Sequence, residues 1–248
     1  MKFLPWLEAA IALAFIPMAA AQSPAFAVAS IRLSGQEVKF EKDGSVQATP
    51  GTLQLRDVTL AHCMRWAYHV QDAQVAGPDA LRDQRYDILA KADGPASEEP
   101  MRLMLRQLLA DRFKVVFHRE TREMRAYALT SADGGKKLHP SAPGTVPSRQ
   151  NTAKSTVEKA ASMPEFAEFM GDVLETPVVD QTNLKGRYDF VLDFTSYLPT
   201  LNRPTQLDDF LAILPSALKG ELGLKLERQS KIPIEVLVID HVEKPSEN

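Results

Sequence analysis

The sequence predicts an α+β fold made of two similar halves, each with the order strand–helix–strand–helix–strand–strand and a mixed or antiparallel sheet. Three observations support this prediction. Segments with apolar residues at helical spacing are interspersed with segments in which every second residue is apolar, as in strands. Short motifs recur in the same order in both halves. Each half ends with two strand-like segments in succession, which favours a mixed or antiparallel sheet over a doubly wound parallel one.

The first helix of each half is predicted by a cap and an apolar stripe. A hydroxyl residue, Thr59 or Ser162, stands before each helix and can accept a hydrogen bond from a backbone N–H of its first turn. Apolar residues then follow at three-residue steps, which places them on one helix face. These are Leu60, Cys63 and Trp66 in the first half, and Met163, Phe166 and Phe169 in the second.

A strand that opens with Arg-Tyr-Asp comes next in each half, at 85–87 and 187–189. Alternation puts the apolar residues of each strand on one side. Asp87 and Asp189 would then occupy equivalent positions. Pseudo-symmetry could bring them to one groove as an acid/base pair, or each could decorate a solvent face or anchor a turn.

The second helix is clearest in the first half, where Ser97 can cap it and Pro100 suits its first turn. Its counterpart is predicted at 215–222, ending at Gly223. Two strands follow each helix, at 114–117 and 126–130 in the first half, and at 225–227 and 234–239 in the second. Extra strand material precedes the first half at 27–33.

The N-terminus has the organisation of a secretory signal. Lys2 gives a basic start, a mostly apolar stretch covers 7–18, and three alanines at 19–21 suit a signal peptidase. The stretch is shorter than the roughly 20 residues that span a bilayer. We therefore predict a signal peptide at 1–21, cleavage after Ala21, and a periplasmic or secreted protein without a stable membrane span. An uncleaved anchor is the alternative.

The remaining chain divides at 131–156, which is rich in Ser, Pro and Gly and is predicted to be a linker or long surface loop. The first half then covers 22–130 and the second 157–248. The net charge of −3 argues against a nucleic-acid partner. The single cysteine, Cys63, lies on an apolar helix stripe, so we expect a buried thiol and no internal disulfide.

Candidates for chemistry are few. Ser216 and Lys219 fit the Ser-x-x-Lys pattern of penicillin-recognising enzymes, but the companion motifs of those enzymes are missing. His62 and His69 are too far apart along one helix to share a metal ion, since the spacing that metalloproteases use is four residues. Asp180 is most simply a turn residue. We expect no cofactor and no metal site.

Several motifs in order resemble the "soil-associated" family of exported bacterial proteins, a domain of unknown function. They are LLADRFK at 108–114, FHRE at 117–120, VVDQTNLKGRYDF at 178–190 and VIDHVEKP at 238–245. The likeness begins near residue 27 and runs to the end of the chain. Asn183 stands where the family usually has Gly, and both suit positive φ. The resemblance implies export without an assigned activity, and some members resemble a domain fused to membrane zinc peptidases of the antibiotic-sensing type.

These observations favour an exported, noncatalytic module that binds an unknown protein or small-molecule partner in the cell envelope or extracellular space. The alternative is a secreted hydrolase-type enzyme, with Asp87, Asp189, Ser216 and Lys219 as its weak candidates for catalysis.

Overall fold

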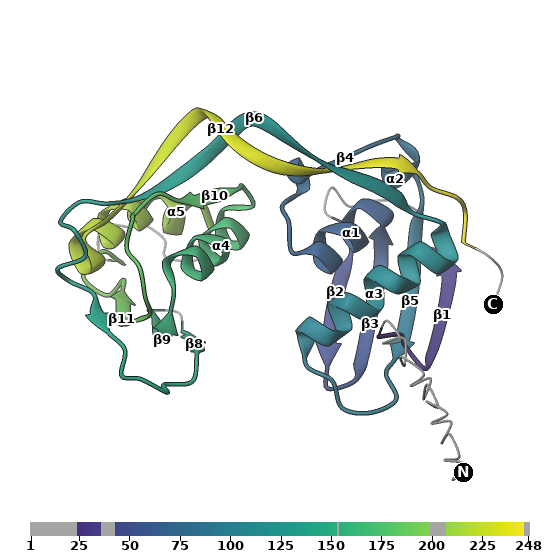
Figure 1. Ribbon diagram of the computed structural model, residues 1–248, viewed down its shortest axis with the longest axis horizontal. Coiled ribbons are helices and arrows are strands. Elements are labelled where there is room, and N and C mark those ends of the chain that lie inside the picture. The colour runs from purple at the N-terminus through teal and green to yellow at the C-terminus, as the bar shows by residue number, and fades with distance from the viewer. Residues whose placement is uncertain (1–23, 36–42, 153, 199–206, 246–248) are drawn as a thin grey trace, which may run out of the picture.

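The computed structural model describes residues 24–35, 43–152, 154–198 and 207–245. Their fold is mixed α+β, as predicted, with three four-stranded sheets and five α-helices in this part of the chain. Two lobes hang from a long two-stranded ribbon that spans both (Figure 1). The predicted signal peptide at 1–21 lies outside the described residues. None of the described helices is long and apolar enough to cross a membrane.

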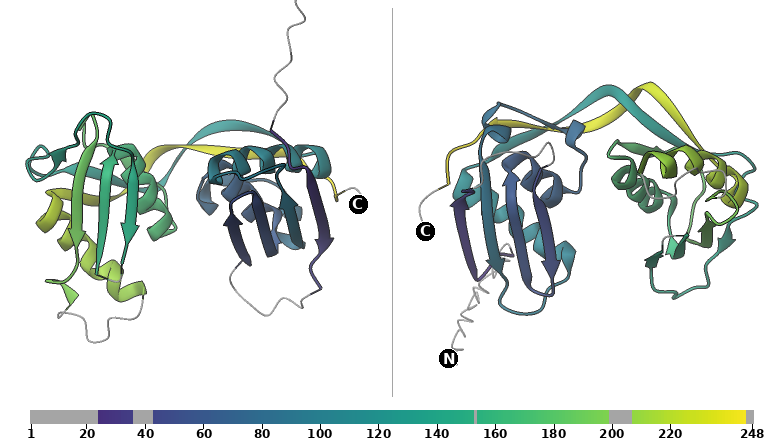
Figure 2. Two further views of the ribbon diagram at one scale, coloured as in Figure 1. Left: turned by 90° about the horizontal axis from the view of Figure 1, so that it is seen from below. Right: turned by 180° about the vertical axis from the view of Figure 1, so that it is seen from behind.

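The first lobe is built on an antiparallel sheet with the strand order β1-β5-β3-β2. Helices α1 and α3 cover one face of this sheet (Figures 1 and 2) and bury Leu55, Met64 and Leu105 in its core. Thr59 caps α1 as predicted, because its hydroxyl accepts a hydrogen bond from the N–H of His62 at 3.1 Å. The elements are β1 (Val28–Leu33), β2 (Ser45–Thr49), β3 (Thr52–Thr59), α1 (Leu60–Tyr68), a 3-10 turn (Asp72–Gln74), β4 (Val75–Ala76), α2 (Ala80–Asp83), β5 (Arg85–Lys91) and α3 (Glu98–Phe113).

The second lobe has an antiparallel sheet with the order β7-β11-β9-β8, packed against α4 and α5. Ser162 caps α4 as predicted, and Glu165 closes a capping box by accepting the N–H of Ser162 at 2.9 Å. The elements are β7 (His139–Pro140), β8 (Ser148–Asn151), β9 (Ser155–Ala161), α4 (Met163–Leu174), β10 (Val178–Asp180), β11 (Tyr188–Asp193), α5 (Leu207–Ala217) and a π-helical segment (Leu218–Leu222).

The ribbon consists of β6 (Val116–Ser131) and β12 (Leu224–His241), which pair antiparallel along their whole length. Each end of the ribbon gains one short parallel strand. In the first lobe β4 pairs with β12, and in the second lobe β10 pairs with β6. These four strands form the third sheet, which joins the lobes.

The continuous ribbon strands differ from the prediction of two separate strands at 114–117 and 126–130, and at 225–227 and 234–239. The stretch between the apolar ends of β6 is charged and exposed, and Arg119 forms an ion pair there with Glu235 on β12. The exposed stretch 118–123 of β6 has no buried apolar face, although Ile232 and Ile234 of β12 are buried in a small separate cluster, so alternation is a poor guide to β6 here.

The lobes do not coincide with the two halves of the sequence. Leu237 and Ile239, near the end of β12, lie in the core of the first lobe. Leu129 and Leu224, at the other end of the ribbon, lie in the core of the second lobe. The second lobe is therefore one continuous stretch inserted into the first, whose last strand comes from the far end of the chain.

The segment 131–156, expected to be a linker or long loop, belongs to the second lobe. It supplies β7, which pairs with β11, and β8, which pairs with β9, while Leu138 is buried in the second core. The ribbon, not this segment, connects the lobes. The composition of the segment 131–156 resembles that of a linker because short edge strands with exposed side chains need few apolar residues.

The helix predicted at 215–222 starts earlier than expected. Helix α5 begins at Leu207, so Pro215 lies inside it rather than in its first turn. The wider π-helical turn follows directly and ends at Gly223, whose φ of 66° fits the predicted helix stop. Proline lacks the N–H that an interior helix position uses, which is why the sequence pattern placed the helix start there.

Candidate functional site

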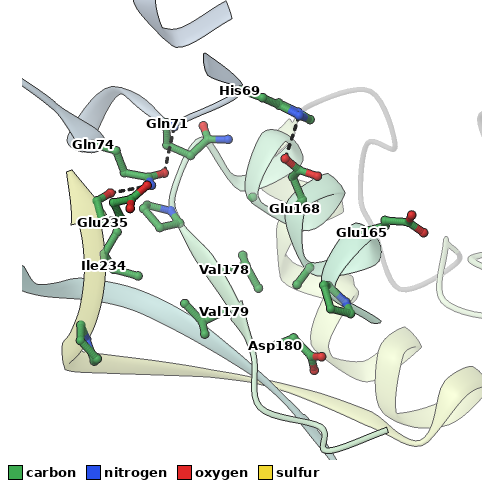
Figure 3. Close-up of a pocket in the computed structure, with 15 residues that line it drawn as sticks. His69, Gln71, Gln74, Glu165, Glu168, Val178, Val179, Asp180, Ile234 and Glu235 are labelled. Carbon is green, nitrogen blue, oxygen red and sulfur yellow. Dashed lines mark hydrogen bonds and ion pairs between the residues drawn. The ribbon is translucent and has the colours of Figure 1, made fainter. Parts of the chain in front are cut away.

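A cavity of about 480 Å³ lies between the two lobes, next to the middle of the ribbon (Figure 3). Its walls come from three parts of the chain that are distant in sequence. The first lobe contributes the turn after α1, the second lobe contributes α4 and β10, and the ribbon contributes the bend of β12. We call this space the interlobe cavity.

The lining of the interlobe cavity combines apolar and polar side chains. The apolar part includes Val179 and Ile234, together with three prolines, Pro164, Pro177 and Pro233. Ile234 is only 5% exposed and belongs to a small apolar cluster against which Val179 packs. The polar part consists of His69, two glutamines and the carboxylates Glu165, Glu168, Asp180 and Glu235. Cavities of this composition suit ligands with an apolar body and a few polar groups.

His69 forms the main contact between the lobes. Helix α1 ends at this residue, whose φ of 52° turns the chain out of the helix. Its Nδ1 lies 2.7 Å from Glu168 Oε1, and its Nε2 lies 3.1 Å from Asp172 Oδ2, both on α4. The hydrogen bond to Asp172, followed by that to Glu168, raises the pKa of His69 to about 9. The imidazole is therefore charged at neutral pH.

The carboxylate partner responds in the opposite sense. Burial alone would raise the pKa of Asp172, but the hydrogen bond and the charge of His69 outweigh it and hold that pKa below its usual value. Gln71, only 7% exposed, adds a hydrogen bond from its Nε2 to Asp172 Oδ1 at 2.8 Å. Gln74 Nε2 donates to the backbone carbonyl of Glu235 at 3.0 Å, which ties the same turn to the ribbon.

The two helices that meet here carry basic residues on one side and acidic residues on the other at matching positions. His62, Arg65 and His69 of the first lobe are spaced as Glu165, Glu168 and Asp172 are in the second. In each helix the first member stands three residues after the cap. The contact between lobes thus pairs the basic end of one stripe with the acidic end of the other.

The two Arg-Tyr-Asp triplets do not meet. Asp87 lies on β5 and Asp189 on β11, in different sheets of different lobes. Each carboxylate accepts the backbone N–H of a residue with positive φ in the neighbouring strand, at 2.8 Å from Asp57 and 2.9 Å from Ala160. Arg85 and Arg187 donate to the carbonyls of those same residues. The triplets therefore hold a β-bulge in each lobe.

The bulge contact also governs the charge of Asp189. The N–H of Ala160, with the hydroxyl of Ser141, lowers the pKa of Asp189 to about 2. A carboxylate held in this way is a poor proton carrier near neutral pH.

Ser216 and Lys219 lie on α5 and the π-helical segment, where both are exposed, and neither lines the interlobe cavity. Cys63 is fully buried as expected, and burial raises the pKa of its thiol. The remaining histidines are engaged elsewhere or exposed: His118 pairs with Asp240, His241 pairs with Glu243, and His139 lies on an exposed edge strand. The part of the chain that the structure describes has no group of three or more His, Cys, Asp or Glu side chains that could hold a metal ion.

Two local expectations in the signature at 178–190 are confirmed. Asp180 is a turn residue, since its Oδ1 accepts hydrogen bonds from the N–H of Thr182 at 2.9 Å and from its hydroxyl at 2.7 Å. Asn183 has a φ of 59°, the conformation that also suits glycine. The turn follows β10, which lines the interlobe cavity, and none of the described residues after it contributes to the lining until Pro233.

Sequence reasoning missed the residues that join the lobes, namely Gln71, Gln74, Glu168, Asp172 and Glu235. They lie on the solvent side of their own elements, where polar residues are ordinary. For Glu168 and Asp172 the sequence signal is the charge complementarity of the two helix stripes, which becomes visible once the helices are aligned on their caps, whereas Gln71, Gln74 and Glu235 lie outside those stripes.

Comparison with known proteins gives one match. A search of curated proteins and a search of solved structures return nothing similar. Residues 61–242 match the family described as "Protein of unknown function (DUF3738)". This range covers most of both lobes and the whole interlobe cavity, and the chain therefore belongs to this family.

Proposed function

We propose that the protein is an exported, noncatalytic module that binds a small molecule or a protein segment in the interlobe cavity. The observation that supports this best is the cavity itself, which is lined by both apolar and polar side chains and takes its walls from both lobes and the ribbon. Sites between domains are common places for ligands. The hydrolase alternative has less support, because Asp87, Asp189 and Ser216 lie on separate elements and outside this cavity.

Export and family resemblance belong to the same proposal. The organisation of residues 1–21 supports cleavage after Ala21 and function in the periplasm or the medium. The resemblance to "soil-associated" proteins, some of them fused to membrane zinc peptidases, agrees with a partner-binding role. Intact mass of the exported protein tests this part, and a chain that still begins at Met1 would contradict it.

We further infer that the two halves arose by duplication of one unit. In each half a hydroxyl residue caps the first helix, and an Arg-Tyr-Asp strand holds a bulge through the same pair of backbone contacts. Such paired contacts support common origin more strongly than a shared order of helices and strands does. A relative with a single half that assembles as a symmetric dimer would support this inference.

The binding proposal is tested by filling the cavity. The mature protein is purified from its own envelope and its bound molecules are identified by native mass spectrometry. Val179→Trp places a large ring in the cavity and is expected to abolish retention of the bound molecule. Val191→Trp is the matched control, because Val191 is 49% exposed on β11 and outside the cavity. Equal retention by both variants contradicts the proposal.

A separate prediction concerns the Ser-x-x-Lys pattern. Ser216→Ala is expected to change neither the melting temperature nor ligand retention, because the side chain is exposed on α5 and does not line the cavity. Thermal unfolding and the retention assay measure this. A hydrolytic activity of the wild-type protein that disappears in the variant would favour the enzyme alternative.

A further inference from the structure

A second cavity, also about 480 Å³, lies beside α1 and is distinct from the interlobe cavity. Its lining is almost wholly polar and combines three arginines and a histidine with three carboxylates. The basic groups are His62 and Arg65 on α1, Arg82 on α2 and Arg85 on β5. We call it the arginine pocket.

Two of the arginines are held in place mainly by backbone carbonyls. Arg85 Nη1 donates to the carbonyl of Asp57 at 2.8 Å, and Arg82 Nη2 donates to the carbonyl of Val75 at 3.1 Å. Their nearest carboxylate oxygens are farther away, at 3.4 Å in each case. Arg82 is thus paired with Asp72, and Arg85 with Asp57 and, at 3.6 Å, with Asp43, so the chain itself supplies counter-charges for both guanidinium groups.

Arg65 has weaker support still. Its Nε is buried and has no acceptor among the described residues, and the same is true of His62 Nδ1. Burial lowers the pKa of His62, so its imidazole is neutral and lacks a strong ion pair. Buried polar atoms without partners are uncommon and costly, yet two of them occur in this one pocket.

The second lobe shows how the corresponding place is filled when the chain supplies the counter-ion. Arg187 contacts the bulge carbonyl of Ala160, as Arg85 contacts that of Asp57. It also pairs with both oxygens of Glu165, at 2.9 and 2.7 Å. In the first lobe the residue three after the cap is His62 instead of Glu165, and the next one on the same stripe is Arg65 instead of Glu168.

Asp43 replaces only part of that missing carboxylate. It accepts hydrogen bonds from the N–H and the hydroxyl of Thr59, the cap of α1, at 3.0 and 2.7 Å, and it stays 3.6 Å from Arg85 Nη1. The other two acidic residues of the pocket are exposed on its margin, Asp72 and Glu175. None of the three carboxylates forms an ion pair with Arg65.

We propose that the arginine pocket binds a small oxyanion, a carboxylate or a phosphate group, through the guanidinium of Arg65, whose buried Nε has no acceptor among the described residues, with Arg82 and Arg85 as neighbouring donors. Guanidinium groups match both anions in geometry and charge. The site is independent of the proposed ligand in the interlobe cavity, so either proposal can fail alone.

The test uses the whole mature chain and two probes, inorganic phosphate and succinate, each titrated at constant ionic strength while the melting temperature is followed. Specific binding gives a saturable rise in melting temperature, and the probe that produces it identifies the anion class. Arg65→Gln is expected to weaken apparent affinity at least tenfold. His62→Glu, which adds a negative charge at the position that Glu165 has in the second lobe, is expected to abolish the response.

Arg119→Gln is the matched control, since Arg119 is an exposed ribbon arginine outside the pocket and is expected to leave the response unchanged. If Arg65→Gln does not fold, His62→Glu still decides the question. The proposal is overturned if neither probe gives a saturable response, or if His62→Glu or a folded Arg65→Gln responds like the wild type.

Discussion

At the scale of single residues, Asp87 and Asp189 show how a carboxylate can be structural in a position that suggests catalysis. Each accepts the N–H of a residue whose positive φ creates a bulge, and an arginine two positions earlier binds the carbonyl of that same residue. The bulge lets the strand turn into the cap of the following helix. The triplet therefore secures the passage from strand to helix in both lobes.

Asp189→Asn is expected to lower the melting temperature by a few degrees at neutral pH, because the amide accepts hydrogen bonds less strongly than the carboxylate. The folded-state pKa of Asp189 is lowered to about 2. The stability that ionised Asp189 adds to the folded protein is therefore complete above the ordinary pKa of 3.8 and is lost as the pH falls through about 2. Thermal unfolding measured from pH 7 down to pH 2 should show the wild type and the variant converging.

Lys159→Gln is the control for this prediction. Lys159 contacts the other carboxylate oxygen at 3.2 Å, while the contact between Asp189 Oδ1 and the Ala160 N–H remains. Little change in melting temperature is expected. A loss as large as that of Asp189→Asn would show that the ion pair, not the bulge contact, carries the effect.

At the scale of elements, the ends of α1 and α4 act as a charged clasp between the lobes. His69 is positioned by the left-handed end of α1, and its partners Glu168 and Asp172 lie one turn apart on α4. Neither helix reveals this contact alone, because each carries its charges on a face that would otherwise be in water.

The clasp is expected to weaken in alkali. The pKa of His69 is raised to about 9. The stabilisation that its charged form gives to the clasp is therefore complete below pH 6.5, the ordinary pKa, and is lost as the pH rises through about 9. Hydrogen exchange at the end of α1, corrected for intrinsic rates, should therefore increase across that range. His69→Gln should show the faster exchange already at pH 7 and little further pH dependence. A His69 signal that titrates near 6.5 by NMR would contradict this prediction.

Many helix and strand features could be predicted from the sequence, and there is a physical reason why the others could not. Some features depend only on residues that are neighbours in the sequence. They are the caps at Thr59 and Ser162, the helix stop at Gly223 and the buried Cys63. The ribbon could not be predicted, since its charged middle is stabilised by cross-strand pairs such as Arg119 and Glu235. The clasp, the interlobe cavity and the arginine pocket depend on how distant segments meet, which no local pattern encodes.

At the scale of the whole molecule, the division into lobes cuts across the order of the sequence. The core of the first lobe includes the end of β12, while the second lobe is continuous from the second part of β6 to the first part of β12. The end of the chain should therefore respond to changes in the first lobe, although it follows the second lobe directly in sequence.

Leu55→Ala, in the core of the first lobe, is expected to destabilise that lobe by about 2–5 kcal/mol. Hydrogen exchange should then lose protection in the first lobe and also at 237–241, but not in the second lobe. Leu192→Ala, equally buried in the second lobe, is the matched variant and should leave 237–241 protected. If the segment 237–241 instead loses its protection in Leu192→Ala and keeps it in Leu55→Ala, this assignment is falsified.

Because β12 contributes to both lobes, it also sets the order in which the two lobes can be completed during synthesis. The second lobe has all its residues once the first part of β12 has emerged, whereas the first lobe, begun earlier, waits for Leu237 and Ile239. Its sheet and helices must remain unfinished while the entire second lobe is made. Loss of only the last part of β12, which carries Leu237 and Ile239, would therefore damage the N-terminal lobe and leave the second lobe's own core complete.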